Sequence, residues 1–184
     1  MSPADRDATA NVLGAFVVAV TDRISTAVAA AAGQSVSAAA ALSALHHFPQ
    51  QPNLDRLGQV LGLTHSGAVR LVDRLADAGL VVRRPGADGR SRTLDLTAAG
   101  RAAAERVTAA RAAALAGLLA DLSPDDHQAL HDLTSRLMAA LVRTKDGGAW
   151  TCRLCDLDAC GRPAGRCPAA NAAAERFGTR PPGT

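Results

Sequence analysis

The fold of this chain is decided by residues 61–75, which read LGLTHSGAVRLVDRL. Within this stretch Ala68, Leu71, Val72 and Leu75 are spaced i, i+3, i+4 and i+7, and this spacing predicts a helix with one buried stripe. The polar residues between them fall on the opposite side. One face of the predicted helix therefore packs, and the other stays exposed.

A very short turn is predicted immediately before this helix. Gly62 can adopt the left-handed conformation that ends a preceding helix, and the hydroxyl of Thr64 can accept from the first free amides of the next one. Asn53 can cap that preceding helix, which carries Leu54 and Leu57. Two helices joined by so short a turn form a helix-turn-helix, whose second helix enters the major groove of duplex DNA.

Two short alternating segments follow, LVVRR at residues 80–84 and RTLDL at residues 92–96. Residues 85–91, PGADGRS, are typical of a turn, so the three pieces predict a β-hairpin. A hairpin in this position is a wing. We therefore expect a winged helix-turn-helix that binds double-stranded DNA.

In their order and spacing these pieces resemble the multiple-antibiotic-resistance regulator (MarR) family of bacterial winged-helix transcription factors. The resemblance rests on LTHS at 63–66, RLVDRL at 70–75, GLV at 79–81, the pair Asp88 and Arg90, and LTAAG at 96–100. With the flanking helices it extends over about residues 8 to 146. It implies a homodimeric regulator, expected to be a repressor, that binds a pseudo-palindromic operator and responds to a small-molecule inducer.

The expected contacts in the major groove come from the exposed side of the second helix. We expect base-edge and phosphate contacts from Thr64, His65, Ser66, Arg70 and Arg74. Arg74 has an alternative role as a salt-bridge partner of Asp73 or Asp77.

The wing contacts are implied by the resemblance. It places Arg90 in the minor groove, with Asp88 orienting the Arg90 guanidinium and Arg92 contacting a backbone phosphate. Asp88 is explained equally well as a turn former before Gly89.

Charge and composition favour duplex DNA as the partner. Residues 64–92 hold six arginines against three aspartates, a local excess of +3 that equals the formal net charge of the whole chain. Aromatic residues make up only 2% of the chain, so the stacking platforms of single-strand binders are missing. No spacing typical of a catalytic site occurs, and we expect no enzyme. The alternative is a dimeric metal-binding or protein-interaction adaptor of winged-helix shape that does not bind DNA.

Long amphipathic helices are predicted on both sides of the head. Residues 8–32 and about 123–145 repeat apolar residues at helical spacing, and these stripes have no sheet to pack against. A homodimer in which these helices interleave would bury the stripes against a second copy of the chain, and we therefore expect a homodimer. The apolar run at residues 12–20 is too short to span a bilayer and no positively charged leader precedes it, so a cytoplasmic protein without a membrane partner is expected.

All four cysteines fall within one short stretch after the last long helix. Cys152, Cys155, Cys160 and Cys167 are spaced C-x2-C-x4-C-x6-C. Few apolar residues surround them, so a hydrophobic core cannot order this stretch, whereas a metal ion bound by four thiolates can. The first two gaps resemble a zinc knuckle, with Cys160 in the position of its histidine.

Zinc is the expected cofactor, and an iron–sulfur cluster is the alternative. Arg153, Arg162 and Arg166 would offset the negative charge of either centre, so they do not discriminate between them. A disulfide or thiol switch is the third possibility. A metal bound here would have one of two roles. It would only order the tail, or the metal loading and redox state of the thiols would also modulate DNA binding.

The sequence thus predicts a mainly α protein, an α+β winged helix, in four parts. Residues 1–34 form an N-terminal dimerisation helix, and residues 35–100 form the winged helix-turn-helix domain. Residues 101–148 form C-terminal dimerisation helices, and residues 149–184 form a small four-cysteine, metal-binding knuckle and a tail.

Overall fold

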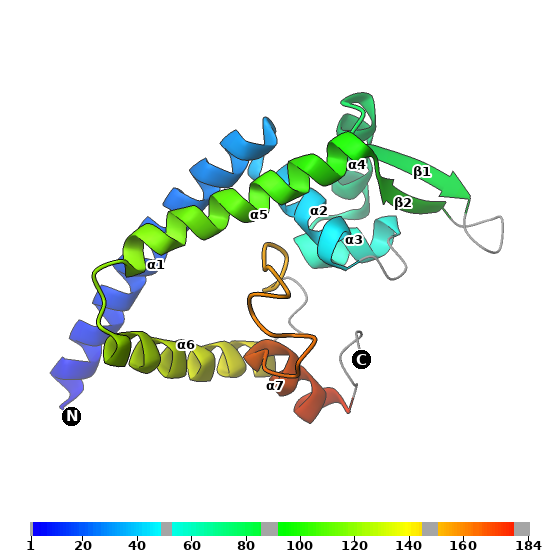
Figure 1. Ribbon diagram of the computed structural model, residues 1–184. Helices are drawn as coiled ribbons and strands as arrows, with labels where there is room; N and C mark the ends of the chain where they lie inside the picture. The colour runs from blue at the N-terminus through cyan, green and yellow to red at the C-terminus, as the bar shows by residue number, and fades with distance from the viewer. Residues whose placement is uncertain (1, 49–52, 86–91, 145–150, 179–184) are drawn as a thin grey trace.

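Long helices flank a small winged-helix head in the computed structural model, which describes residues 2–48, 53–85, 92–144 and 151–178 (Figure 1). In chain order the elements are α1 (Pro3–Ala32), α2 (Val36–His47), α3 (Leu54–Leu61), α4 (His65–Asp77), β1 (Val81–Pro85), β2 (Arg92–Leu96), α5 (Ala98–Leu119), α6 (Pro124–Thr144) and α7 (Pro168–Phe177). The predicted mainly helical winged helix, with a two-stranded wing between long helices, is confirmed.

The first helix begins earlier than its apolar pattern predicts. The hydroxyl of Ser2 accepts from the amide of Asp5 at 3.1 Å, and the Asp5 carboxylate accepts from the amide of Ser2 at 2.9 Å. This capping box, with Pro3 at the first helical position, starts α1 at residue 3 rather than near residue 8. The expectation used hydrophobic spacing alone and missed the cap.

The core of the head forms around α2, which is buried from Ala38 to Leu45. Small alanine side chains there allow α1 and α5 to approach α2 closely, while larger side chains from the surrounding elements fill the remaining space. The fully or almost fully buried large residues are Val28, Leu42, Leu71, Val72, Leu75, Val81, Leu94 and Val107. The head is therefore a packed unit on which α4 and the wing are mounted.

The wing is a two-stranded antiparallel sheet. Its register pairs Val81 with Leu96, Arg83 with Leu94 and Pro85 with Arg92 at the end nearest the turn. One side of this ribbon contributes Val81 and Leu94 to the core, so its base is fixed to the head.

The helices outside the head leave apolar side chains uncovered. In the N-terminal half of α1 Val12 is 68% exposed and Val18 63% exposed, whereas Val28, further along, is buried in the head. By length and composition alone α1 is apolar enough to cross a membrane, with a mean hydropathy of 1.6 in its most apolar window. The expectation that it is too short considered only residues 12–20.

A second, smaller core lies at the far end of α6. Val142 of α6 packs there with Cys152, Cys167 and alanines of α7, and Phe48, just after α2, packs against the same cluster. Residues 151–167, hereafter the cysteine segment, form the turns that connect these parts. In Figure 1 this segment rises from α7 into the space between α6 and the α2–α5 side of the head.

Candidate functional site

The helix α4 is held against the head by its predicted apolar stripe. Ala68, Leu71, Val72 and Leu75 are at most 1% exposed. The preceding helix, α3, packs closely against α4, since a Cβ atom on Gly58 would lie 3.4 Å from the Cβ atom of Ala68. The opposite side of α4 is thereby fixed in orientation and exposed.

The turn before α4 has the predicted chemistry. Gly62 has a φ of 65° and closes α3, and the hydroxyl of Thr64 accepts from the amide of Gly67 at 3.2 Å. The Thr64 hydroxyl also lies 3.3 Å from that of Ser66. Thr64 is thus a helix cap as well as an exposed candidate for a DNA contact.

His65 is oriented by a residue that sequence reasoning missed. Its Nδ1 atom lies 3.0 Å from a carboxylate oxygen of Asp55, in the first turn of α3. When Nδ1 carries the proton and donates it to Asp55, Nε2 faces solvent and is available to a DNA group. An acid at the start of α3 is explained by the helix dipole alone, so only the tertiary arrangement reveals this pair.

If α4 binds DNA as the sequence predicts, Asp55 positions His65, and Asp55→Ala should weaken operator binding about threefold to tenfold, because an exposed ion pair contributes little individually. Fluorescence anisotropy with a labelled operator measures the change. Asp55→Asn keeps an acceptor for the imidazole and should stay close to wild type. Equal affinities for Asp55→Ala and wild type would show that the pair does not orient His65.

Two of the arginines near α4 are paired within the head. Arg83 on β1 lies 2.6 Å from the carboxylate of Asp73, and Arg84 lies 2.8 Å from that of Asp95. The predicted alternative pairing of Arg74 with Asp73 is therefore not observed, because Asp73 pairs with Arg83 across to the wing.

Three other arginines remain available to a ligand. Within the part of the chain that the structure describes, Arg70, Arg74 and Arg92 are exposed and have no ion-pair partner. Arg70 and Arg74 lie one turn apart on the exposed side of α4, and Arg92 lies at the start of β2. These three arginines therefore leave positive charge exposed on α4 and at the start of the second wing strand. Asp88 and Arg90 lie outside the described residues.

The base of the wing is fixed in place by Thr97 and Gly100, which belong to the LTAAG motif at residues 96–100. The Thr97 hydroxyl donates to the carbonyl of Gly79 at 2.7 Å and accepts from the amide of Gly100 at 3.0 Å. Gly100 is packed so closely that a Cβ atom there would lie 1.9 Å from the carbonyl oxygen of Leu80. Only glycine allows α5 to start this close to β1.

Gly100→Ala should lower the free energy of unfolding by about 2–3 kcal/mol, because the added methyl group collides with backbone. The thermal midpoint should fall by about 5–10 °C in a calorimetric scan. Gly117→Ala is the matched control in the same helix. Its added Cβ meets only the flexible end of Arg23, at 3.3 Å, so it should be neutral or stabilising. A midpoint for Gly100→Ala equal to that of the control would contradict the proposed close packing.

The four cysteines form a second chemical site. All four are free thiols, and Cys152 and Cys167 are each 4% exposed. Sulfur–sulfur hydrogen bonds link Cys152 to Cys155 and to Cys167, and Cys167 to Cys160. The thiols therefore contact one another in a chain. Among the described residues, no three or more His, Cys, Asp or Glu side chains are arranged so that they could hold a metal ion as they stand.

The pKa values of these thiols differ, because their hydrogen-bond partners and their burial differ. The hydrogen bond from Cys152 lowers the pKa of Cys155 to about 7, and the guanidinium groups of Arg111 and Arg162 act in the same direction. The hydrogen bond from Cys152 also lowers the pKa of Cys167 to about 5. Burial raises the pKa of Cys160 to about 11. Near neutral pH the cluster thus carries thiolate character, which is the form that binds metal ions and reacts with oxidants.

The arrangement around α4 defines the class of protein. A packed helix-turn-helix whose second helix exposes arginines, followed by an antiparallel wing, is a winged helix-turn-helix, a fold whose second helix enters the DNA major groove in the proteins that bind DNA with it. The sequence model of the MarR family matches residues 32–91 of this chain. The match covers less than half of the chain, and it shows that this segment is similar to the winged helix-turn-helix of that family.

Solved structures share the fold over most of the chain. A MarR family protein from Bacillus stearothermophilus is 21% identical, with a TM-score of 0.68, and the match covers 79% of this chain and 99% of that one. MepR, a transcription regulator of the Staphylococcus aureus multidrug efflux pump MepA, is 15% identical (TM-score 0.63; 72% and 97% covered). A MarR family transcriptional regulator from Rhodococcus sp. RHA1 is 22% identical (TM-score 0.56; 74% and 96% covered). No curated protein matches the sequence.

Proposed function

We propose that this protein is a homodimeric transcriptional regulator that binds a pseudo-palindromic duplex operator, with one α4 helix in each of two successive major grooves. The observation that carries the proposal is the exposed face of α4, where Arg70 and Arg74 have no ion-pair partner among the described residues, while the opposite face is buried. A rigid helix with free guanidinium groups suits bidentate recognition of guanine edges and binding of phosphates.

Each end of the site has a distinct role in this proposal. Ser66 and His65, at the start of α4, are placed to contact base edges, because the beginning of a recognition helix enters the groove first. Arg92, on the wing, is placed to bind a phosphate. The minor-groove role of Arg90 and its support by Asp88 remain predictions from the resemblance, as does a small-molecule inducer.

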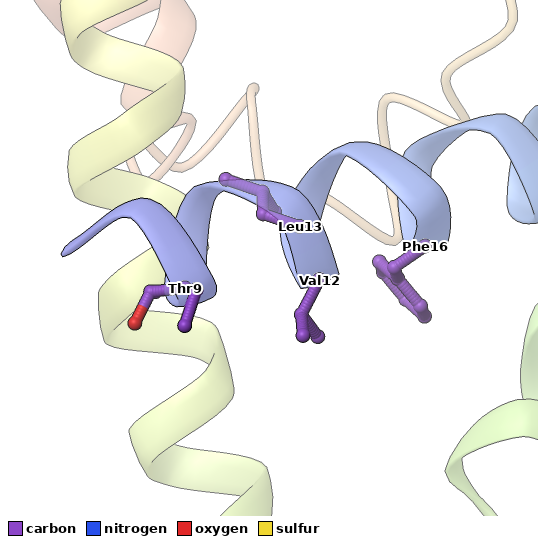
Figure 2. Close-up of a pocket in the computed structure, with 5 residues that line it drawn as sticks. Thr9, Val12, Leu13 and Phe16 are labelled. Atoms are coloured by element: carbon purple, nitrogen blue, oxygen red, sulfur yellow. The ribbon is translucent and has the colours of Figure 1, made fainter. Parts of the chain in front are cut away.

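The homodimer is supported by the uncovered face of α1. Thr9, Val12, Leu13 and Phe16 line a shallow apolar hollow on this helix, and Figure 2 shows Thr9, Val12 and Phe16 projecting from the same side. Phe16 is 51% exposed. Exposed large side chains in such a continuous row are typical of a surface that another chain covers.

A matching apolar stripe lies on α6. Leu133, Leu137 and Leu141 are each about half exposed, at 55%, 49% and 52%, and they share one side of the helix. A second copy of the chain could cover both stripes at once through a two-fold interface. Burial of Val28 and Ala32 in the head core favours this over a membrane span for α1, because the same helix is needed to complete the head.

Salt dependence distinguishes DNA binding from the adaptor function. A regulator of this kind should bind its operator with an affinity that falls steeply with salt, with a slope of about one per phosphate contact. The same titration on a scrambled duplex gives the non-specific reference. An adaptor would show no operator preference and no binding to either duplex at moderate salt, and that result would overturn the proposal.

A further inference from the structure

The cysteine segment contains buried polar atoms that lack partners. Within the described residues, Thr151 Oγ1 and Arg162 Nε are buried without a hydrogen bond, and both lie in this segment. The Arg162 guanidinium also lies 5.4 Å from the ring centroid of Phe48 and acts electrostatically on Cys155. A partly buried arginine whose buried Nε–H donor has no partner, beside a thiol, is suited to a site that carries negative charge.

The four thiols lie in one cluster and interact with one another. In a tetrahedral zinc site with Zn–S bonds of about 2.3 Å, neighbouring sulfur atoms are about 3.8 Å apart. The cysteine side chains would therefore have to rotate to surround one ion. An iron–sulfur cluster places several inorganic atoms between its cysteine pairs. To bind one here, the thiols of Cys152 and Cys167, which now interact, would have to move apart.

The surroundings of the sulfur atoms also suit thiolate ligands. Cys167 is the N-cap residue of α7, where the positive end of the helix dipole favours a thiolate. Arg111 of α5 and Arg162 supply positive charge next to Cys155, which would partly offset the net charge of −2 of zinc with four thiolates.

The segment touches both the head and the dimerisation helix. Leu154 packs against the core of the head, while Cys152 and Cys167 share the second core with Val142 of α6 and with Phe48. Burial and the neighbouring His46 lower the pKa of the His47 imidazole, and the charges of Asp156 and Asp158 in the cysteine segment oppose this lowering. The cysteine segment is therefore in contact with α2 and α6 at once.

From these observations we propose that Cys152, Cys155, Cys160 and Cys167 together bind one Zn²⁺ ion, and that this site makes the cysteine segment a brace between the head and α6. On binding, each thiol that is still protonated releases its proton to solvent. The site does not depend on DNA binding, so its test needs no operator.

Metal content is the direct test. The full chain, purified without oxygen and without chelator, should contain one zinc per chain by mass spectrometry of its metals and should have no visible absorption. After zinc removal under reducing conditions, Co²⁺ should bind and produce the intense visible bands of a tetrahedral tetrathiolate site. Iron and sulfide in the purified protein, a disulfide-linked segment, or a chain that binds neither Zn²⁺ nor Co²⁺ would overturn the assignment.

Single substitutions test the ligand set. Cys160→Ser should lose most of the zinc affinity, because serine is a poor ligand for zinc at this position. Ala159→Ser is the matched control, since it introduces the same side chain at the adjacent, exposed position and should retain one zinc per chain. Equal zinc retention in both variants would show that Cys160 is not a zinc ligand. The Co²⁺ spectrum of the unaltered chain tests the site independently of any folding defect in the variants.

The brace is tested by hydrogen exchange of the full chain with and without zinc. Removing the metal should increase exchange about tenfold at the end of α2 and at the end of α6, while the α4 amides stay protected. Unchanged exchange at both helix ends would mean that the metal orders the segment without bracing the head.

Discussion

The double variant Arg70→Ala/Arg74→Ala is expected to bind the operator about a thousandfold more weakly than wild type, because each specific arginine contact contributes about 1–3 kcal/mol. Both guanidinium groups are exposed on α4 and unpaired within the described residues, so their loss should leave the fold intact. Anisotropy titrations at several salt concentrations should also show a shallower salt slope, reduced by about one for each phosphate contact removed.

The control removes the same charge elsewhere. Arg6 and Arg176 are exposed on α1 and α7, away from α4, and Arg6→Ala/Arg176→Ala should lose only the small affinity that follows from lower net charge. If the two double variants bind the operator equally well, α4 is not the recognition helix. Matching thermal midpoints for wild type and the α4 variant are required before the affinities are compared.

The second large effect is expected at the dimer interface. Leu133→Glu/Leu137→Glu places two carboxylates on the exposed stripe of α6, where a partner chain would have to bury them. The variant should be a monomer by light scattering, and its operator affinity should fall at least about a hundredfold because the two half-sites are no longer bound together. The head should keep its stability, since neither leucine belongs to its core.

His131→Glu is the matched control on α6. His131 is exposed and lies beside the leucine stripe rather than within it, so this variant should remain dimeric and bind the operator. A wild-type chain that is monomeric at micromolar concentration, or a dimeric leucine variant, would contradict the proposed interface.

The sequence was sufficient to predict the helix-turn-helix and wing because their signals are local. The spacing from Ala68 to Leu75, the left-handed Gly62 and the capping Thr64 each act within a few residues, and the structure has all of them. The start of α1 was missed because the Ser2–Asp5 capping box carries no hydrophobic pattern.

The contacts that refine the site could not be predicted, because they join residues distant in sequence. Asp55 reaches His65 only once α3 packs beside α4, and Asp73 pairs with Arg83 only once β1 returns past α4. The spacing of the cysteines suggested a metal, but nothing in it indicates that the segment packs against Phe48 or that Leu154 contacts the head. These contacts depend on tertiary packing, for which the local pattern gives no signal.

The most direct test of the central claim is selection from a library of random duplex DNA with the full chain, followed by sequencing of the bound fraction. A two-fold dimer that places α4 in successive major grooves should enrich a pseudo-palindrome whose half-sites are centred about 10 base pairs apart. The selected duplex should bind two chains. Enrichment of a single, asymmetric site or of no sequence at all would contradict the account.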